Sequence, residues 1–423
     1  MTLGHSTVHT RVSDHRPGQR TPVRRLGSWL SATAAVTGVI LTMVTANPAA
    51  AVPATGTILG AGSPSAVPGS YLVVLDQDRK LETTATATAT TATGLVDRYN
   101  GKVTRVFDQV LHGFAAQLTE RDARRLAAHP AVARVEQDQR VHAMGSQANP
   151  PSWGLDRIDQ RYLPLDNTYN FGPSTGVRVY VLDTGIRITH TDFGGRASYG
   201  YDTVDNDLIA QDGHGHGTFV AGLIAGSTYG VAKDANVVAV RVLNDYGSGT
   251  TAAVVAGIDW VTSTASSPSV VNMSLGGPVS SILDQAVRAS ISRGITYTVA
   301  AGANGVNANT VSPARVTQAL TVGITNRNDT VPAASNWGDV IDICAPGIGV
   351  TSLWNTGDSV VTTNSGTSFG TAHVAGAVAL YLNANPTATP ATVHSAIVSH
   401  GTTGIVPATN WCGSPGRLLY TGP

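Results

Sequence analysis

The sequence predicts an α/β protein with a mostly parallel sheet and helices on both faces, preceded by a small α+β domain. Three observations support this fold class. Apolar strand-like runs alternate with helical runs beyond residue 153, as in a parallel sheet with crossover helices. A shorter set of strands and helices occupies residues 70–142. With 423 residues, 42% of them apolar, the chain exceeds one average domain and suffices for a sizeable core.

The larger region carries polar residues where predicted strands end and predicted helices begin. We expect strands at residues 177–183, 237–243, 269–275, 295–301 and 319–324, and helices at 251–265 and 281–293. Two further helices are expected directly after His216 and Ser368. Because strand ends and helix starts of such a sheet lie at one edge, these polar residues should converge there.

Residues 70–142 predict a separate unit of the β-α-β-β-α-β type. We expect strands at 71–75, 102–107, 113–118 and 132–136, with helices at 84–99 and 119–128. Thr119 and Asp122 have the spacing of a capping box, which favours a helix start at this point. A Thr/Ala repeat over residues 83–93 leaves a frayed helix and a loop as alternatives for the first helix.

The first 51 residues have the features of a secretory signal peptide. Five arginines precede a moderately apolar stretch over residues 26–44, and the alanines at 49–51 offer a small-residue cleavage site. A membrane anchor is the alternative, but Ser, Thr and Gly residues interrupt the stretch. We therefore expect a secreted, extracellular protein without a stable membrane anchor.

Charge and composition argue against a nucleic-acid partner. Charged residues make up 13% of the chain, and the formal net charge is zero. From Gln147 onward, twelve Lys and Arg residues stand against seventeen Asp and no Glu, a net charge of −5. Such a composition offers no phosphate-binding surface.

Three segments supply an acid, an imidazole and a hydroxyl at the edges of regular elements. Asp183 ends an apolar strand, His216 lies in an Asp-Gly-His-Gly-His-Gly-Thr loop, and Ser368 lies in a Gly-Thr-Ser-Phe-Gly segment. Small residues around Ser368 let a substrate backbone approach, and a helix start there aims N–H groups at a developing negative charge. A serine hydrolase needs this set, because serine attacks, histidine transfers the proton and aspartate orients the imidazole. Taken alone, Asp183 and the Ser368 segment also fit an ordinary turn or loop, and His216 fits a structural or metal-binding histidine.

In this order, the three segments resemble the subtilase family of serine peptidases, and most of all its proteinase K-like secreted bacterial members. The resemblance covers residues 70–420 and implies a secreted serine endopeptidase of subtilisin-like fold, with Asp183, His216 and Ser368 as the triad. His216 is matched rather than His214, because the family's histidine directly precedes Gly-Thr. We expect a monomer that acts on proteins or peptides.

The smaller unit resembles the inhibitor-like propeptide of this family, chiefly in segments 111–115 and 135–138. The resemblance implies that the propeptide assists folding, inhibits the enzyme and is then cleaved off between about residue 144 and residue 147. We therefore divide the chain into a signal peptide at 1–51, a ferredoxin-like propeptide at 52–146 and a peptidase domain at 147–423.

Two Gly-rich segments are predicted to form the edges of a peptide-binding cleft. Their small side chains let the backbone pair with an extended peptide, although either segment alone fits a plain turn. The resemblance implies that the cleft is lined by Gly247, Ser248, Gly249, Ser274, Leu275 and Gly276, with Ala301 and Gly302 at the floor of the pocket for the residue before the scissile bond. Small apolar walls imply a broad preference for apolar residues there.

One position departs from the family pattern. The family follows its Ala-Ala-Gly segment at once with an Asn that donates a hydrogen bond to the oxyanion, whereas here Ala303 follows Gly302 and Asn304 comes one place later. Either the glycine-flanked loop shifts so that Asn304 reaches the oxyanion, or the donor is missing. In the second case the chain is a catalytically weak or inactive peptide-binding protein, which is the alternative function.

Two structural features are expected beside the catalytic groups. Cys344 and Cys412, the only cysteines, suggest one disulfide in an exported chain, with two unpaired cysteines as the alternative. The resemblance implies a structural calcium ion held by the Asp342 carboxylate and by the carbonyl groups of Thr317 and Ala319, since calcium prefers several oxygen ligands. A solvent-facing or helix-capping Asp342 is the alternative there.

Overall fold

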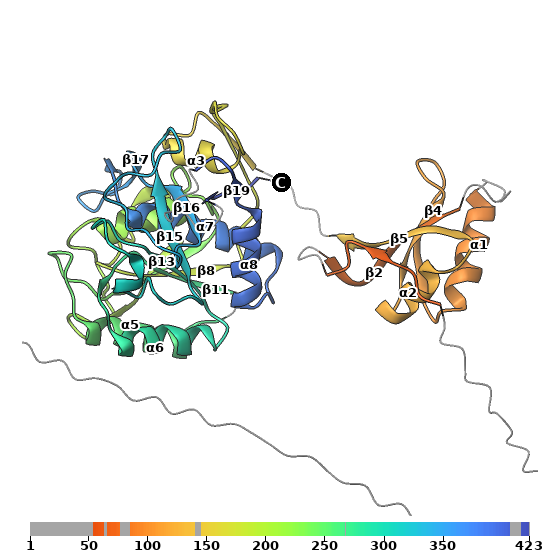
Figure 1. Cartoon of the computed structure of the whole chain (residues 1–423), viewed down its shortest axis with the longest axis horizontal. Helices are drawn as coiled ribbons and strands as arrows, with labels where there is room; N and C mark the ends of the chain where they lie inside the picture. Colours follow the sequence, from red (N-terminus) through yellow and green to blue (C-terminus); the bar gives the residue numbers. More distant parts are fainter. Residues whose placement is uncertain are drawn as a thin grey trace, which may run out of the picture. The chain divides into compact units, whose positions relative to one another are not determined.

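The computed structural model describes residues 54–62, 66–76, 85–139, 145–266, 268–406 and 416–422. The predicted signal peptide at 1–51 and Cys412 lie outside these residues. A smaller unit up to residue 139 and a larger unit from residue 145 each build a sheet and a core of their own (Figure 1). Within the described residues, no helix combines the length and the apolar character that a membrane span requires.

The smaller unit has the predicted β-α-β-β-α-β order, preceded by one two-residue strand that was not predicted from the sequence. Its elements are β1 (Ile58–Leu59), β2 (Ala66–Leu75), α1 (Ala85–Asp97), β3 (Lys102–Phe107), β4 (Gly113–Gln117), α2 (Glu120–Ala127) and β5 (Val132–Gln139). The strands form a sheet in the order β1-β5-β2-β4-β3, antiparallel except for the β1–β5 pair. Thr119 caps α2 by accepting a hydrogen bond from the backbone N–H of Asp122, as the capping box predicts. The Thr/Ala repeat is helical from Ala85 onward, so the helix is the correct alternative.

The core of this unit lies between the sheet and its two helices. Val73, Phe114 and Val135 contribute from the strands, and Leu95 and Leu126 contribute from the helices. All five side chains are buried, so the unit has the apolar core that an independently folded segment requires.

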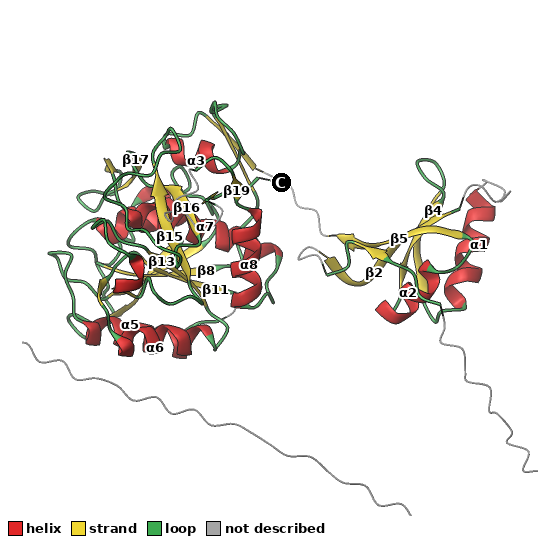
Figure 2. Cartoon of the chain, viewed as in Figure 1, coloured by secondary structure: helices red, strands yellow, loops and turns green. Residues whose placement is uncertain are grey.

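The larger unit is built on a nine-stranded sheet (Figures 1 and 2). Its strands, in spatial order, are β19 (Thr402–Thr403), β20 (Arg417–Leu418), β16 (Ile343–Pro346), β15 (Leu320–Thr325), β13 (Thr296–Ala300), β11 (Ser269–Met273), β8 (Arg178–Asp183), β10 (Asn236–Arg241) and β9 (Ala197–Asp202). All neighbouring pairs from β20 to β9 are parallel, and only β19 runs antiparallel to its neighbour. The predicted mostly parallel sheet is therefore confirmed.

Helices cover both faces of this sheet, as the alternation of elements predicts (Figure 2). One face carries α4 (His216–Ala225), α7 (Thr367–Ala384) and α8 (Pro390–His400), and the other carries α5 (Thr251–Thr264) and α6 (Ser281–Ile291). Successive side chains of a strand point to opposite faces. In β8, Val179 and Val181 accordingly join the core under α4 and α7, while Tyr180 and Leu182 join the core under α5 and α6.

Shorter elements complete the larger unit. They are β6 (Gly145–Ala148) paired with β7 (Thr168–Phe171), β12 (Gly277–Pro278) paired with β14 (Val311–Ser312), β17 (Val350–Leu353) paired with β18 (Val361–Asn364), the helix α3 (Trp153–Ile158), and the 3₁₀ turns η1 (Thr191–Phe193) and η2 (Ala308–Thr310). The pairing of β6 with β7 places residue 145 and its successors in the larger unit. The boundary between residues 146 and 147, which depends on processing, stays a prediction.

Candidate active site

One edge of the sheet brings together the three residues that the motifs single out. Asp183 is the last residue of β8, His216 is the first residue of α4, and Ser368 is the second residue of α7. Gly217 permits the close approach of α4 to β8, since a Cβ there would lie 2.1 Å from the Gly185 carbonyl oxygen. The topology therefore gathers an acid, an imidazole and a hydroxyl from three distant segments.

Asp183 and His216 form a short hydrogen bond in the interior. The Nδ1 atom of His216 lies 2.7 Å from Oδ1 of the fully buried Asp183, and this oxygen also accepts from the backbone N–H of Thr184. Because the carboxylate can only accept, Nδ1 carries the proton and Nε2 is left as the acceptor. Burial alone would lower the pKa of His216, but the charge and hydrogen bond of Asp183 and the charge of Asp212 outweigh it. The pKa is therefore raised, as in a base that is stabilised once protonated.

Ser368 is anchored to the end of β11 through Ser274. The Ser368 hydroxyl donates to the Ser274 carbonyl at 3.1 Å, and the Ser274 hydroxyl donates to the Ser368 carbonyl at 2.9 Å. The side chain of Asn272 donates in turn to the Ser274 hydroxyl. Within the described residues no hydrogen bond joins Ser368 to His216. Because Ser368 lies in the first turn of α7, its N–H has no partner within the helix and faces outward.

Aromatic rings cover one side of the imidazole. The ring of Phe369 lies 5.8 Å from that of His216 and 4.3 Å from that of Phe219, centroid to centroid. Trp354 packs edge-on against Phe219 and fills the space beside Gly215, where a Cβ would lie 2.5 Å from the indole ring. This packing excludes water from one side of His216, which strengthens its interaction with the carboxylates.

A cleft of about 600 Å³ opens beside His216. All six residues predicted for its edges line it: Gly247, Ser248, Gly249, Ser274, Leu275 and Gly276. Ala301 and Gly302 are not among its walls. Further residues that line the cleft were not predicted from the sequence, among them Thr184, His214, Leu243, Val254, Pro278 and Leu283. Among the described residues, the lining contains no carboxylate and no Lys or Arg, and it combines hydroxyl and imidazole groups with apolar side chains.

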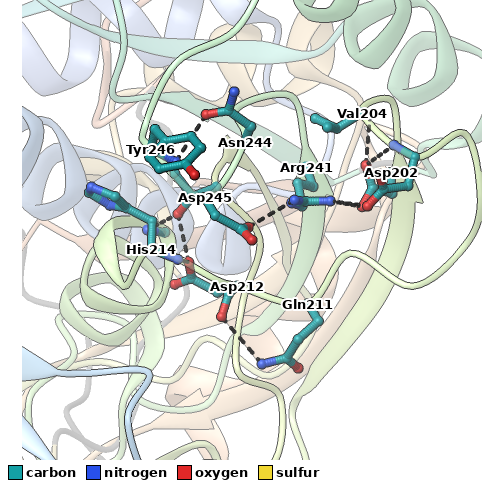
Figure 3. A network of polar contacts seen from close by, with 12 residues as sticks. Asp202, Val204, Gln211, Asp212, His214, Arg241, Asn244, Asp245 and Tyr246 are labelled. Carbon is teal, nitrogen blue, oxygen red and sulfur yellow. Dashed lines mark hydrogen bonds and ion pairs between the residues drawn. The ribbon is translucent and has the colours of Figure 1, made fainter.

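Figure 3 shows how a charged network anchors one edge of this cleft. Arg241, at the end of β10, pairs with Asp202 at 2.6 Å, with Asp205 at 2.6 Å and with Asp245 at 2.9 Å. Asp245 precedes Tyr246, whose backbone N–H donates to the side chain of Asn244. The same Asn244 oxygen accepts from the N–H of residue 248, so the cleft loop is held by its own side chains.

The loop after β13 is held by one buried side chain. Oδ1 of the fully buried Asn336 accepts from the backbone N–H groups of Asn304 and Val306 at 2.9 and 3.1 Å, and Nδ2 donates to the Ala301 carbonyl at 2.7 Å. The side chain of Asn304 is exposed and has no hydrogen-bond partner among the described residues. No sequence signal points to Asn336, which lies more than thirty residues from the loop.

The predicted calcium residues and Cys344 lie around β15 and β16. Asp342 accepts from the backbone N–H of Thr321 at 2.8 Å through one carboxylate oxygen, and the other lies 3.3 Å from Nε2 of His394. Thr317 and Ala319 belong to the turn before β15. No cluster of three or more His, Cys, Asp or Glu suited to a metal ion occurs in the described ranges. Cys344 is buried in β16, and because Cys412 lies outside the described residues, their disulfide stays a prediction.

Comparisons with known proteins identify both units. Residues 174–410 match the Subtilase family, and residues 70–144 match the Peptidase inhibitor I9 family. The chain is 43% identical over 397 residues to the "Extracellular serine proteinase" of Thermus sp. (strain Rt41A), covering 90% of this chain and 96% of that protein. It is 45% identical over 377 residues to the "Alkaline serine exoprotease A" of Vibrio alginolyticus, covering 86% of this chain and 70% of that protein. A solved structure described as a cold-adapted subtilisin-like serine proteinase has a TM-score of 0.62 and 49% identity, covering 64% of this chain and 97% of that chain.

A second imidazole lies in the interior behind Ser368. His373 of α7 is fully buried; its Nδ1 donates to the Phe369 carbonyl at 2.7 Å, while Nε2 has no partner among the described residues. Burial lowers the pKa of His373 to about 4, and the hydrogen bond to Phe369 opposes this only in part. The side chain therefore stays neutral at physiological pH.

We expect acid to destabilise the fold through His373. Between its ordinary pKa of 6.5 and its folded pKa of about 4, the unfolded chain binds a proton at this side chain and the folded chain does not. Stability present at neutral pH is therefore lost as the pH falls through this window, by about 3 kcal/mol. His373→Asn should remove this part of the pH dependence of the free energy of unfolding, measured by urea denaturation in a Ser368→Ala background.

The exposed His214 supplies the control for this measurement. His214→Asn also removes one imidazole but leaves the interior intact, so it should keep the steep loss of stability between pH 6.5 and 4. An equally steep loss in His373→Asn would contradict the assignment.

Proposed function

Because the chain belongs to the subtilase family of serine endopeptidases, we propose that Ser368 is its nucleophile, His216 its general base and Asp183 the group that orients the imidazole. The observation that carries this assignment is the 2.7 Å hydrogen bond between His216 and the buried Asp183, at the edge where α7 begins with Ser368. The cleft beside His216 supplies the place for a substrate peptide.

The proposed reaction begins when the Ser368 hydroxyl turns from the Ser274 carbonyl to Nε2 of His216. Its oxygen then attacks the substrate carbonyl carbon while its proton passes to the imidazole, whose positive charge Asp183 stabilises without taking the proton. The carbonyl oxygen becomes an oxyanion that accepts from the Ser368 N–H. The imidazolium returns its proton to the leaving amine, and water hydrolyses the acyl-enzyme by the same steps.

The cleft supports a broad preference for apolar residues before the scissile bond. Its inner surface is built from side chains such as Leu243, Val254, Leu275 and Leu283, and it lacks a fixed charge that would select a charged substrate side chain. Gly247 and Gly276 at its edges leave room for the backbone of an extended peptide.

The proposed function includes an inhibitory propeptide and secretion from the cell. The match of residues 70–144 to the Peptidase inhibitor I9 family supports an inhibitory propeptide that is removed by self-cleavage. The features of residues 1–51 and the printed name of the Thermus relative support secretion to the extracellular medium. We also propose that the protein acts as a monomer without a stable membrane anchor. The comparisons give no support to the alternative of an inactive peptide-binding protein.

Self-cleavage should depend on Ser368. We expect the secreted wild-type chain to shorten to a form that begins near residue 147, whereas Ser368→Ala keeps its propeptide, as read from intact masses. Ser365→Ala is the matched control, because Ser365 is exposed, lies three residues earlier and should leave processing unchanged. If the wild type and Ser368→Ala both keep the propeptide, the assignment of Ser368 as the nucleophile is wrong.

We propose that Asn304 supplies the second oxyanion donor. The bonds from Asn336 occupy the backbone of Asn304 and leave its side-chain amide exposed and unpaired within the described residues. Ala303, at the position of the family's Asn, has no group that could donate from its side chain. The Ser368 N–H alone would leave the oxyanion with one donor.

Removing the Asn304 amide should slow the chemical step. Asn304→Ala is expected to lower kcat by about 10²–10³ with little change in KM, as for loss of one oxyanion donor. The double variant Ala303→Asn with Asn304→Ala should recover most of this loss, which separates a missing donor from a damaged loop. Unchanged kcat in Asn304→Ala, measured on a peptide amide substrate, would show that Asn304 is not the donor.

A structural calcium ion is proposed at Asp342. The donor set fits calcium, because the carboxylate oxygen facing His394 and the carbonyl groups of Thr317 and Ala319 are all hard oxygen ligands. Asp342 and the two carbonyl groups would hold the ion, and the ion would link the turn before β15 to the start of β16.

Calcium should raise the thermal midpoint of the full chain in the Ser368→Ala background, and Asp342→Ala should reduce this shift. A ligand at one hundred times its Kd stabilises the folded state by about 2.7 kcal/mol, which gives a measurable rise in Tm. The measurement is the Tm in calcium and in a chelator, for the Ser368→Ala chain and for the same chain with Asp342→Ala. An equal calcium shift in Asp342→Ala would place the effect elsewhere.

A further inference from the structure

The segment before α4 contains a buried carboxylate that the proposed mechanism does not use. Asp212 is 3% exposed. Its Oδ1 accepts from the Thr184 hydroxyl at 2.8 Å and from the backbone N–H groups of His214 and Gly215 at 2.9 and 2.7 Å. Its Oδ2 accepts from the backbone N–H and the hydroxyl of Thr218 at 2.9 and 2.5 Å. Five donors therefore converge on one carboxylate.

These bonds join the end of β8 to the first turn of α4. Thr184 follows the last residue of β8. The N-cap of α4, Gly215, has no side chain that could accept from the free N–H groups of the first turn, and Asp212 fills this role through Thr218. The first turn carries His216, so its position relative to β8 depends on the carboxylate of Asp212.

Asp212 has no cationic partner in the part of the chain that the structure describes. The Arg241 network in Figure 3 pairs its guanidinium with Asp202 and Asp245, whereas Asp212 is bonded to the backbone at His214. Nowhere in the described ranges does a Lys or Arg side chain form an ion pair with Asp212. A buried negative charge that only N–H and O–H donors satisfy favours a positive charge close by.

The groups that face His216 come from three elements. Asp183 approaches from β8, Phe369 from α7, and His214 from the preceding loop with its ring 6.4 Å away. Among these neighbours and Asp212, only Asp183 and Asp212 are acids, and both raise the pKa of His216. The imidazole therefore responds to two carboxylates, although it is hydrogen-bonded to one.

We propose that Asp212 is a positioning residue of the peptidase: its carboxylate holds the first turn of α4 against the end of β8, and its charge stabilises the imidazolium of His216 during proton transfer. This inference rests on the proposed function, in which His216 is the general base. A residue that served only the fold would support the position of α4 and leave the proton affinity of His216 unchanged.

The test is the pH profile of Asp212→Asn, which removes the charge and keeps the shape. We expect kcat to fall by about tenfold, the change that 1.4 kcal/mol of lost transition-state stabilisation produces, with KM within about twofold. The acid limb of kcat/KM should move to lower pH, because the imidazole loses a carboxylate that favours its protonated form. Asp259→Asn is the matched control: Asp259 is an exposed acid on α5, outside the cleft and the Arg241 network, so rate and profile should stay as in the wild type.

An NMR titration of His216 does not require an active enzyme, so it also tests the proposal if Asp212→Asn does not undergo self-cleavage. The full chain with Ser368→Ala, labelled at histidine, reports the pKa of His216 by NMR, with the signal assigned through His216→Ala. Adding Asp212→Asn should lower this pKa, and adding Asp259→Asn should not. Thr184→Val removes the hydroxyl bond to Asp212 without changing the charge, so it should lower kcat with the acid limb unmoved. Thr184→Ser keeps the hydroxyl and should recover most of the kcat that Thr184→Val loses.

The outcomes separate the inference from the function it rests on. If His216→Ala keeps wild-type turnover, the proposed function itself is wrong. If His216→Ala is inactive while Asp212→Asn keeps the wild-type rate and acid limb, only the inference is overturned. A lower Tm in Asp212→Asn with an unmoved acid limb and an unmoved NMR titration would also overturn it, because the role would then be confined to the fold.

Discussion

The packing of α4 against α7 sets the geometry of the whole site, because each helix carries one of the proposed catalytic side chains in its first turn. Gly376 makes the approach of the two segments possible: a Cβ there would lie 2.5 Å from the side chain of Val231 and 3.3 Å from the carbonyl oxygen of Ile224. Near the helix starts, the rings of Phe219 and Phe369 lie 4.3 Å apart. A larger side chain at any of these contacts would separate the helix starts, and with them the imidazole and the hydroxyl.

Two imidazoles on these neighbouring helices, the fully buried His373 and the partly exposed His216, show what sets the protonation of the site. Burial acts in the same direction on both, because it disfavours the charged form. At His373 only a backbone carbonyl opposes it, and the pKa falls to about 4. At His216 the carboxylates of Asp183 and Asp212 reverse the effect, and the pKa rises. The difference between a neutral core histidine and the proposed general base therefore lies in nearby negative charge, with which no Lys or Arg side chain pairs among the described residues.

The fold and the three motif residues could be predicted because both depend on local patterns. Alternating strand and helix signals imply a parallel sheet, and a parallel sheet brings strand ends and helix starts to one edge, so Asp183, His216 and Ser368 could be placed together before any coordinates. The parts that escaped prediction depend on contacts between distant segments. Gly200 under Trp260 interrupts the apolar pattern of β9, and the five donors around Asp212 become visible only once the loop is folded.

The loop after β13 explains how the fold tolerates the departure at position 303. Asn336 holds this loop through backbone atoms of residues 301, 304 and 306, so these hydrogen bonds do not depend on which side chains stand at 303 and 304. Gly302 takes a φ of +95°, a conformation that glycine adopts without strain. A Cβ at this position would lie 2.5 Å from the side-chain nitrogen of Asn336, so only glycine fits there. The loop backbone therefore keeps its conformation when the asparagine stands at position 304 instead of position 303. The proposed second oxyanion donor then depends on how far the Asn304 side chain extends toward the substrate. Patterns of hydrophobic and turn residues in the sequence do not predict that distance.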